Sequence, residues 1–164
     1  MLFRRLIIVS TFVCSACGSD PFSNVGGTVD GHTVSSQSFY WGGPFLVMTD
    51  VAQTCKDMYW VQQGSWYIDG DEAPTDTDLV ALQFSFNESD LTAGTYSVEG
   101  QAPVYAHVIV TNNSTMTVYR ADSGTLTIDE ITDNDRVLGS VNLMFDEEAV
   151  TGDFDVEWCN NIKG

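Results

Sequence analysis

The chain has 164 residues, of which 43% are hydrophobic and 12% aromatic. This composition is sufficient for the packed core of one domain and excludes a chain that is disordered throughout. There are 23 Asp and Glu residues against 6 Lys and Arg residues, a formal net charge of −17. So acidic a surface disfavours nucleic acid and anionic lipid head groups as partners, favours cations or basic proteins, and keeps the protein in solution.

Residues 1–16 have the three parts of a secretory signal peptide. Arg4 and Arg5 give a positive start, residues 6–13 form a mostly apolar run, and Ser15 and Ala16 are small. The apolar run is too short to cross a bilayer, which takes about 20 residues. We expect removal of residues 1–16, which leaves four basic and 23 acidic residues, a net charge of −19.

The segment Ser15-Ala16-Cys17-Gly18 resembles the lipobox of bacterial lipoproteins, with Cys14 at the position where Leu is usual. The resemblance implies cleavage before Cys17, a diacylglyceryl group on the Cys17 sulfur, and a further acyl chain such as palmitate on the new amino group. It places the protein in the bacterial cell envelope, and Gly18 after the cysteine favours the outer membrane. An ordinary cleaved signal is the alternative. A zinc or redox role for the C-x-x-C pair lacks a second ligand pair.

Cleavage and lipidation leave Cys55 and Cys159. Two cysteines in an exported domain favour a disulfide, with two free thiols as the alternative. A bridge across about 100 residues stabilises a fold by roughly 4.7 kcal/mol at most. We therefore divide the chain into the signal peptide 1–16, the lipidated cysteine and a short tether at 17–24, and one folded domain at 25–164.

From residue 25 onward the patterns predict half-buried antiparallel strands, with the apolar face in the core and the polar or charged face in water. Apolar and polar side chains alternate in 79–86, 124–131, 140–145 and 152–158, and β-branched and aromatic residues fill 103–110 and 116–121. In the last of the alternating segments, three apolar residues (Phe154, Val156, Trp158) alternate with three acidic ones (Asp153, Asp155, Glu157). Turn sequences such as Asp30-Gly31 separate the runs.

These strands predict an all-β fold. About nine strands at regular spacing are typical of a single antiparallel β-sandwich or a barrel-like variant of it. One short helix is expected over residues 50–57, with Asp50 as its N-cap and Cys55 on it.

Two acidic loops are weak candidates for calcium binding, because Ca²⁺ prefers clustered carboxylate and carbonyl oxygens. The first loop holds Asp69, Asp71, Asp76 and Asp78, and the second covers residues 129–135. Neither matches the EF-hand spacing. The alternative is a solvated loop that keeps strand edges from pairing.

Three adjacent aromatic pairs, Tyr40-Trp41, Tyr59-Trp60 and Trp66-Tyr67, lie in the first half of the domain. Exposed rings could stack on sugars or anchor a protein partner, whereas buried ones would belong to the core. Catalysis has less support. The two histidines, His32 and His107, lie in no G-x-S-x-G or H-E-x-x-H context, and hydrolysis by paired carboxylates has no distinguished pair. We assign no catalytic residue, no firm metal ligand and no cofactor.

The layout of most of the mature chain resembles that of the mostly uncharacterised small lipoproteins common in myxobacteria. The shared features are an early strand at Gly27-Thr28-Val29-Asp30-Gly31, Thr49-Asp50 followed by Cys55, a strand at Gly94-Thr95-Tyr96, the turn Ser123-Gly124-Thr125, and a closing segment from Val150 to Cys159. The resemblance implies a β-sandwich domain and a place in the envelope, and it implies no active site.

The expected function is that of a membrane-anchored envelope lipoprotein with a structural or interaction role. Its expected partners are the membrane, through the lipid, and an envelope protein or polysaccharide. The first alternative is a carbohydrate- or calcium-binding β-sandwich module, and the second is a hydrolase using paired carboxylates.

Overall fold

The computed structural model describes residues 21–57, 78–87, 91–99, 103–112, 115–132, 136–160 and 162. These residues form twelve β-strands and no helix, so the predicted all-β class is confirmed. The strands are β1 (Phe22–Ser23), β2 (Gly26–Val29), β3 (His32–Val34), β4 (Ser38–Gly42), β5 (Phe45–Thr49), β6 (Leu79–Phe86), β7 (Gly94–Ser97), β8 (Val104–Asn112), β9 (Thr115–Arg120), β10 (Ser123–Ile131), β11 (Arg136–Phe145) and β12 (Glu148–Trp158).

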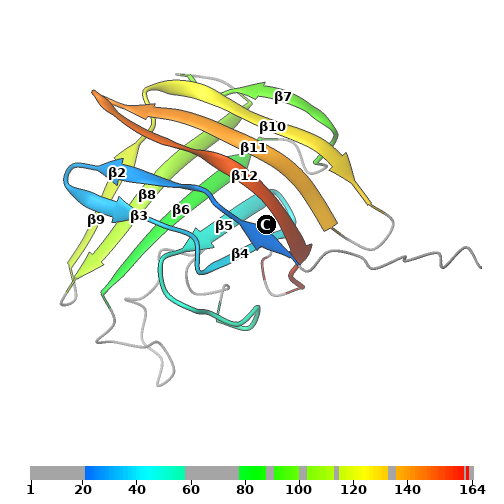
Figure 1. Cartoon of the computed structure of the whole chain (residues 1–164), viewed down its shortest axis with the longest axis horizontal. Helices are drawn as coiled ribbons and strands as arrows, with labels where there is room; N and C mark the ends of the chain where they lie inside the picture. Colours follow the sequence, from blue (N-terminus) through cyan, green and yellow to red (C-terminus); the bar gives the residue numbers. More distant parts are fainter. Residues whose placement is uncertain are drawn as a thin grey trace, which may run out of the picture.

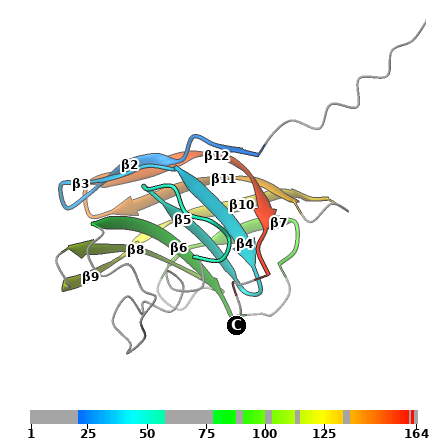
Figure 2. The same cartoon turned by 90° about the horizontal axis from the view of Figure 1, so that it is seen from below.

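All twelve strands belong to one hydrogen-bonded sheet that curls back on itself (Figure 1). The main path runs β7-β10-β11-β12-β4-β5-β6-β8-β9. Off this path, β1 and β2 pair with β12, and β3 pairs with β2. In the view from below, the half of the sheet with β10, β11 and β12 lies over the half with β5, β6 and β8 (Figure 2). The space between the halves holds the main core.

The last strand, β12, joins the two halves of the sheet. One of its edges pairs antiparallel with β11 over ten residue pairs, from Arg136 opposite Glu157 to Phe145 opposite Glu148. The other edge pairs with β2, then β1, and finally with β4 in parallel at Glu157 and Trp158. The sheet therefore turns from one half to the other at the C-terminal end of β12.

The inner face of the curled sheet follows the predicted alternation. Leu82 and Phe84 of β6 and Phe154 and Val156 of β12 are buried there. The ring of Phe154 packs on that of Phe39 in β4, with centroids 5.0 Å apart, and so closes the turn of the sheet. A fully buried side chain of this size stabilises a fold by about 1.5–3 kcal/mol.

A second, smaller apolar cluster lies on the outer face of β5, β6 and β8. Its buried members include Val47, Ala81, Ile109, Cys159 and Ile162. The predicted half-buried character of 79–86 is therefore wrong, since even Gln83 on the outer face is only 8% exposed. The sequence of β6 could not reveal this, because the residues that follow β12 supply part of the cover.

The predicted helix over residues 50–57 does not form. Asp50 extends the sheet instead of capping a helix: its N–H donates to the Val80 carbonyl (3.0 Å), and its Oδ1 accepts from the Val80 N–H (2.8 Å). The segment then makes a turn in which the Thr54 N–H and Oγ1 both donate to Asp57 Oδ2. Such local bonds to side chains compete with helical ones.

The strand number and arrangement also differ from the prediction of a nine-strand sandwich. Strands of two to four residues, such as β1, β2 and β3, leave too short a pattern to be recognised. The parallel pairing of β12 with β4 joins what would be two sheets into one. The predicted Asp30-Gly31 turn is confirmed, because both residues have positive φ (49° and 75°) and connect β2 to β3 as a two-residue hairpin loop.

Candidate functional site

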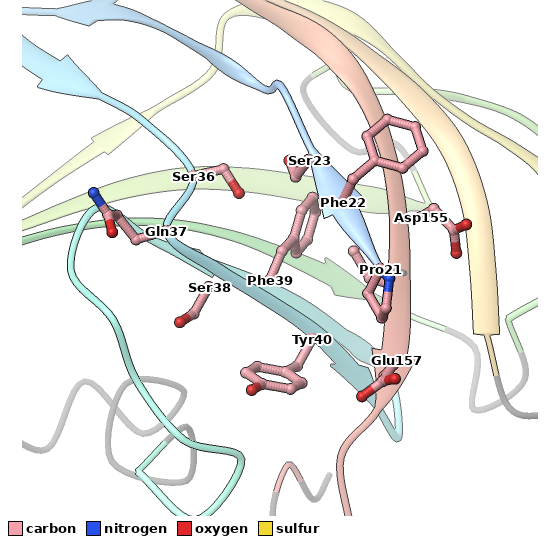
Figure 3. Close-up of a pocket in the computed structure, with 11 residues that line it drawn as sticks. Pro21, Phe22, Ser23, Ser36, Gln37, Ser38, Phe39, Tyr40, Asp155 and Glu157 are labelled. Atoms are coloured by element: carbon pink, nitrogen blue, oxygen red, sulfur yellow. The ribbon is translucent and has the colours of Figure 1, made fainter. Parts of the chain in front are cut away.

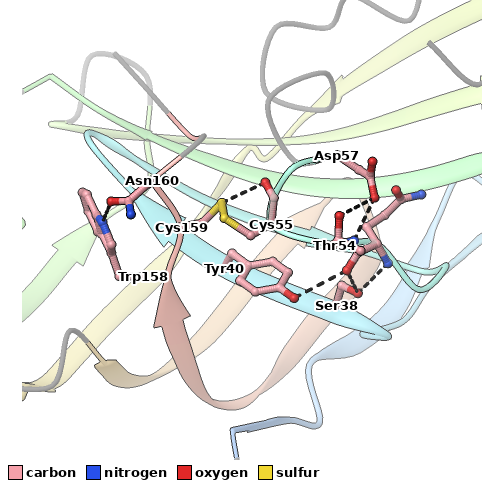
Figure 4. The surroundings of a disulfide bond; sticks show 9 residues. Ser38, Tyr40, Thr54, Cys55, Asp57, Trp158, Cys159 and Asn160 are labelled. Atoms are coloured by element: carbon pink, nitrogen blue, oxygen red, sulfur yellow. Dashed lines mark hydrogen bonds between the residues drawn. A yellow bond between two sulfur atoms is a disulfide. The ribbon is translucent and has the colours of Figure 1, made fainter. Parts of the chain in front are cut away.

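The two cysteines predicted to pair lie at bonding distance. The sulfur atoms of Cys55 and Cys159 are 2.20 Å apart and their Cα atoms 5.4 Å apart, across 104 residues of sequence (Figure 4). Cys159, just after β12, is fully buried in the outer apolar cluster. The bridge thus ties the C-terminal end of the chain to the segment that follows β5.

Hydrogen bonds hold this bridged segment against β4. Ser38 Oγ donates to the Gln53 carbonyl (3.0 Å) and accepts from the Gln53 N–H (2.8 Å), and Tyr40 Oη donates to the same carbonyl (3.5 Å; Figure 4). Residues 50–57 therefore lie over the outer face of the sheet as a fixed cover rather than as a free loop. We find no chemistry in this region beyond the disulfide itself.

A hollow of about 240 Å³ lies where β1 and β4 separate along the edge of β12 (Figure 3). We call it the fork hollow, and residues 21–23, 36–40 and 155–157 line it. It exists because β12 pairs with β1 at Phe154 and Asp155 but with β4 only from Glu157 onward. Its volume is below the range of about 300–1,000 Å³ that is usual for small-molecule sites.

The side chains around the fork hollow can hold a polar group but are poorly arranged for catalysis. Ser36 supplies a hydroxyl and Glu157 an exposed carboxylate, whereas the hydroxyl of Ser38 is bonded to the Gln53 backbone. Asp155 is not available, since its carboxylate is bonded to Arg136 at 2.6 and 2.8 Å. No histidine or cysteine is among the lining residues, so the serines have no adjacent general base of that kind.

Asp155 is one of the acidic residues that the alternation placed on an exposed face. That expectation is wrong for this residue, because Asp155 is only 3% exposed. Leu138 on β11 and Phe22 on β1 stand opposite it on the two neighbouring strands. The single Arg of β11 was the only sequence signal that could have suggested a buried partner for it.

A second hollow, of about 450 Å³, lies where the β2–β3 and β11–β12 turns approach β9. We call it the acidic hollow, after four carboxylates that line it: Asp30, Asp122, Asp146 and Glu148. Sequence reasoning did not single out this group, because the four come from three separate connections. The aromatic ring of Tyr119 and the guanidinium of Arg120 also border it.

Three carboxylates of the acidic hollow are already used by the turns. Tyr119 Oη donates to Asp30 Oδ2 (2.8 Å), which raises the pKa of the Tyr119 hydroxyl. The N–H of Asp30 donates to Glu148, and that of Asp146 donates to Asp122 Oδ2 (2.6 Å). Across the part of the chain that the structure describes, no three His, Cys, Asp or Glu side chains are placed to hold a metal ion.

The predicted calcium candidates are not brought together within the described residues. Asp69, Asp71 and Asp76 lie outside those residues, and Asp78 is exposed just before β6. In the second acidic loop, Asp129 and Glu130 are exposed on β10, and 133–135 lie outside the described residues.

The aromatic pair Tyr40-Trp41 is mostly structural. Trp41 packs edge-on against Trp158, with centroids 4.4 Å apart, and borders the main core. Tyr40 borders the outer cluster. The pairs Tyr59-Trp60 and Trp66-Tyr67 lie outside the described residues.

His107 stands on the outer face of β8, opposite Gln83 on β6 and Arg120 on β9. Burial, helped by the charge of Arg120, lowers the pKa of His107 below its usual 6.5. An amide and a guanidinium are not nucleophiles that an imidazole could activate. His32 begins β3, with its ring 6.1 Å from that of Tyr119, so the two histidines lie on different parts of the sheet.

The predicted lipidation residue, Cys17, lies outside the described residues, four positions before the first of them. Among the described residues, none belongs to a helix long and apolar enough to span a membrane. Comparisons of the chain with protein-family models, with curated proteins and with solved structures give no match.

Proposed function

We propose that this chain is a lipid-anchored protein of the bacterial cell envelope, with a structural or interaction role and no catalytic one. The observation that carries the proposal is the position of Cys17, after an apolar run and the small pair Ser15-Ala16, and only five residues before β1. A lipobox so close to the folded domain leaves room between them for a short tether only.

Two features of the domain support an exported location. A disulfide between Cys55 and Cys159 would persist in an oxidising compartment and would be reduced in most cytosols. The strongly acidic composition suits a domain that stays hydrated beside a membrane. Gly18 after the cysteine favours the outer membrane as destination.

We further propose that the fold is a variant of the β-sandwich, like that of the small myxobacterial lipoproteins that the sequence resembles. In this variant, the two halves of the sheet correspond to the two layers of a sandwich, and the β12–β4 pairing links them. A sandwich of this kind offers broad polar faces and strand edges, which suit contacts with an envelope protein or a polysaccharide better than turnover of a small substrate.

Mass spectrometry of the protein purified from bacterial membranes tests the proposal. We expect a mature chain that begins at Cys17 and carries a diacylglyceryl group. The Cys17→Ser variant should lack that mass and leave the membrane fraction. A mature wild-type chain without lipid on Cys17 would refute the anchor.

A second candidate function is carbohydrate binding, which the polar lining of the fork hollow favours. The hydroxyl of Ser36, the carboxylate of Glu157 and the ring of Tyr40 are groups of the kind that recognise a sugar. Chemical-shift titration of the isolated domain with peptidoglycan fragments should perturb residues 36–40 and 155–157 first. A response spread evenly over the molecule, or none, would count against this candidate.

A further inference from the structure

Phe22 is the most exposed large apolar side chain among the described residues, with 51% of its surface accessible. It lies in β1, the strand nearest the N-terminus, and the adjacent Pro21 is exposed as well. A phenyl ring in this position loses apolar contact with water if a lipid surface covers it. The ring stands at the mouth of the fork hollow (Figure 3).

The distance along the chain places this ring beside the membrane, provided that Cys17 carries the proposed lipid. Phe22 lies five positions after Cys17, so the two Cα atoms are at most about 18 Å apart. The polar head-group layer on each side of a bilayer is about 5–8 Å thick. A lipid on Cys17 therefore keeps Phe22 within about 18 Å of the anchor, and a path of residues 18–20 along the membrane surface brings the ring to the head groups.

The charge distribution of the domain favours the same orientation. Asp155 stands directly across from Phe22, and Arg136 neutralises it. The four carboxylates of the acidic hollow lie around the β2–β3 and β11–β12 turns, at the end of the sheet away from β1 (Figures 1 and 2). Anionic head groups repel that end more strongly than the end that carries β1. Exposed Asp153 and Glu157 flank β1 and limit the contact to the tip around Phe22.

We propose that the ring of Phe22 inserts into the head-group layer as a second membrane contact, beside the lipid on Cys17. The domain then stands on its β1 end. The fork hollow opens at the membrane surface, and the acidic hollow points away from the membrane. This inference rests on the proposed lipid anchor and adds to it an orientation that the anchor alone does not specify.

Spin labelling of the lipid-anchored protein tests the orientation. A nitroxide is attached to Phe22→Cys, and to Val118→Cys as a matched control, because Val118 is 49% exposed on the edge strand β9. The introduced thiol is the only free one if Cys17 is lipidated and Cys55 and Cys159 are bridged. Each labelled protein is purified from membranes and reconstituted in phosphatidylcholine vesicles. Its unlipidated Cys17→Ser form is measured in solution.

We expect the accessibility of position 22 to a water-soluble nickel complex to fall at least about two-fold in vesicles, relative to the unlipidated form. Position 118 should keep its accessibility. Equal accessibility of position 22 in both states, with lipid on Cys17 verified by mass spectrometry, overturns the orientation and leaves the anchor intact. Absence of lipid on Cys17 overturns both. Protection of position 22 in the unlipidated form that disappears on dilution would assign the surface to a second copy of the chain, and so overturns the membrane contact.

Discussion

Arg136 and Asp155 form a two-pronged ion pair on neighbouring strands of the sheet. Arg136 Nη2 lies 2.6 Å from Asp155 Oδ2, and Arg136 Nε donates to Asp155 Oδ1 at 2.8 Å. Asp155 is 3% exposed, so the pair exchanges little with water. The pair lies next to β1, because Phe22 is paired with Asp155 on the adjacent strand, and it therefore supports the end of the domain that we place at the membrane.

Replacing Asp155 by Asn should lower the free energy of unfolding by about 3 kcal/mol. The substitution removes the charge that compensates a largely buried guanidinium, and breaking one side of such a pair typically costs 3–5 kcal/mol. Equilibrium unfolding in urea measures the change. The control Asp153→Asn, two residues away and exposed, should stay within about 0.5 kcal/mol of wild type. A loss below about 1 kcal/mol for Asp155→Asn would contradict the role of the pair.

Removal of the disulfide should cost about 2–5 kcal/mol of stability. Closing a loop of 104 residues restricts the unfolded chain, and the bridge also holds Cys159 in the outer cluster. The variant is Cys55→Ser with Cys159→Ala, since a hydroxyl at the fully buried position 159 would add an unrelated cost.

Urea unfolding with and without a reductant supplies the control for that change. Wild type should lose stability on reduction, and the double variant should be insensitive to it. Two free thiols detected in unfolded, unreduced wild-type protein would refute the bridge.

Stability should decline as the pH falls below about 6.5, through His107. Its pKa is lowered in the folded protein, so the unfolded chain binds the proton more readily. The contribution is present above the unfolded pKa of 6.5 and is lost as the pH falls through the folded pKa. Urea unfolding between pH 5 and 8 should show a smaller decline for His107→Gln than for wild type. Equal slopes for wild type and His107→Gln would exclude this role of His107.

Replacing Gly139 by Ala should destabilise the domain by about 1–3 kcal/mol, the usual cost of overpacking. A Cβ atom at Gly139 would collide with the Thr127 carbonyl on β10 and would lie 2.7 Å from Phe154 Cζ. Thermal and urea unfolding both measure the loss. Ser140→Ala, the next residue on the opposite face of β11, is the matched control and should change stability little. A Gly139→Ala variant as stable as wild type would contradict the close approach of the Thr127 backbone to Gly139.

Local patterns predicted those parts of the fold that depend on neighbouring residues. The alternation in β12 placed Phe154 and Val156 in the core, and the Asp-Gly pair at 30–31 predicted the hairpin turn, because both signals arise from the geometry of a few adjacent residues. The partners Cys55 and Cys159 followed from excluding the two N-terminal cysteines.

Predictions from local patterns failed at residues whose positions depend on contacts with distant parts of the chain. Asp50 was expected to cap a helix, but Val80, thirty residues later, offers it two backbone bonds. Asp155 was expected in water, but Arg136 and β1 enclose it. Neither outcome leaves a trace in the adjacent sequence.

The sequence by itself thus determined the all-β class and the pairing of Cys55 with Cys159, and it alone carries the proposal of an anchor at Cys17, since each depends on residue type and on spacing along the chain. Only the tertiary structure decided that β12 bonds to both halves of one curled sheet, that its edge opens into the fork hollow, and that Asp155 is buried there. The physical reason is that hydrogen bonding between strand edges and burial of charge depend on which distant segments meet, and local periodicity does not encode that.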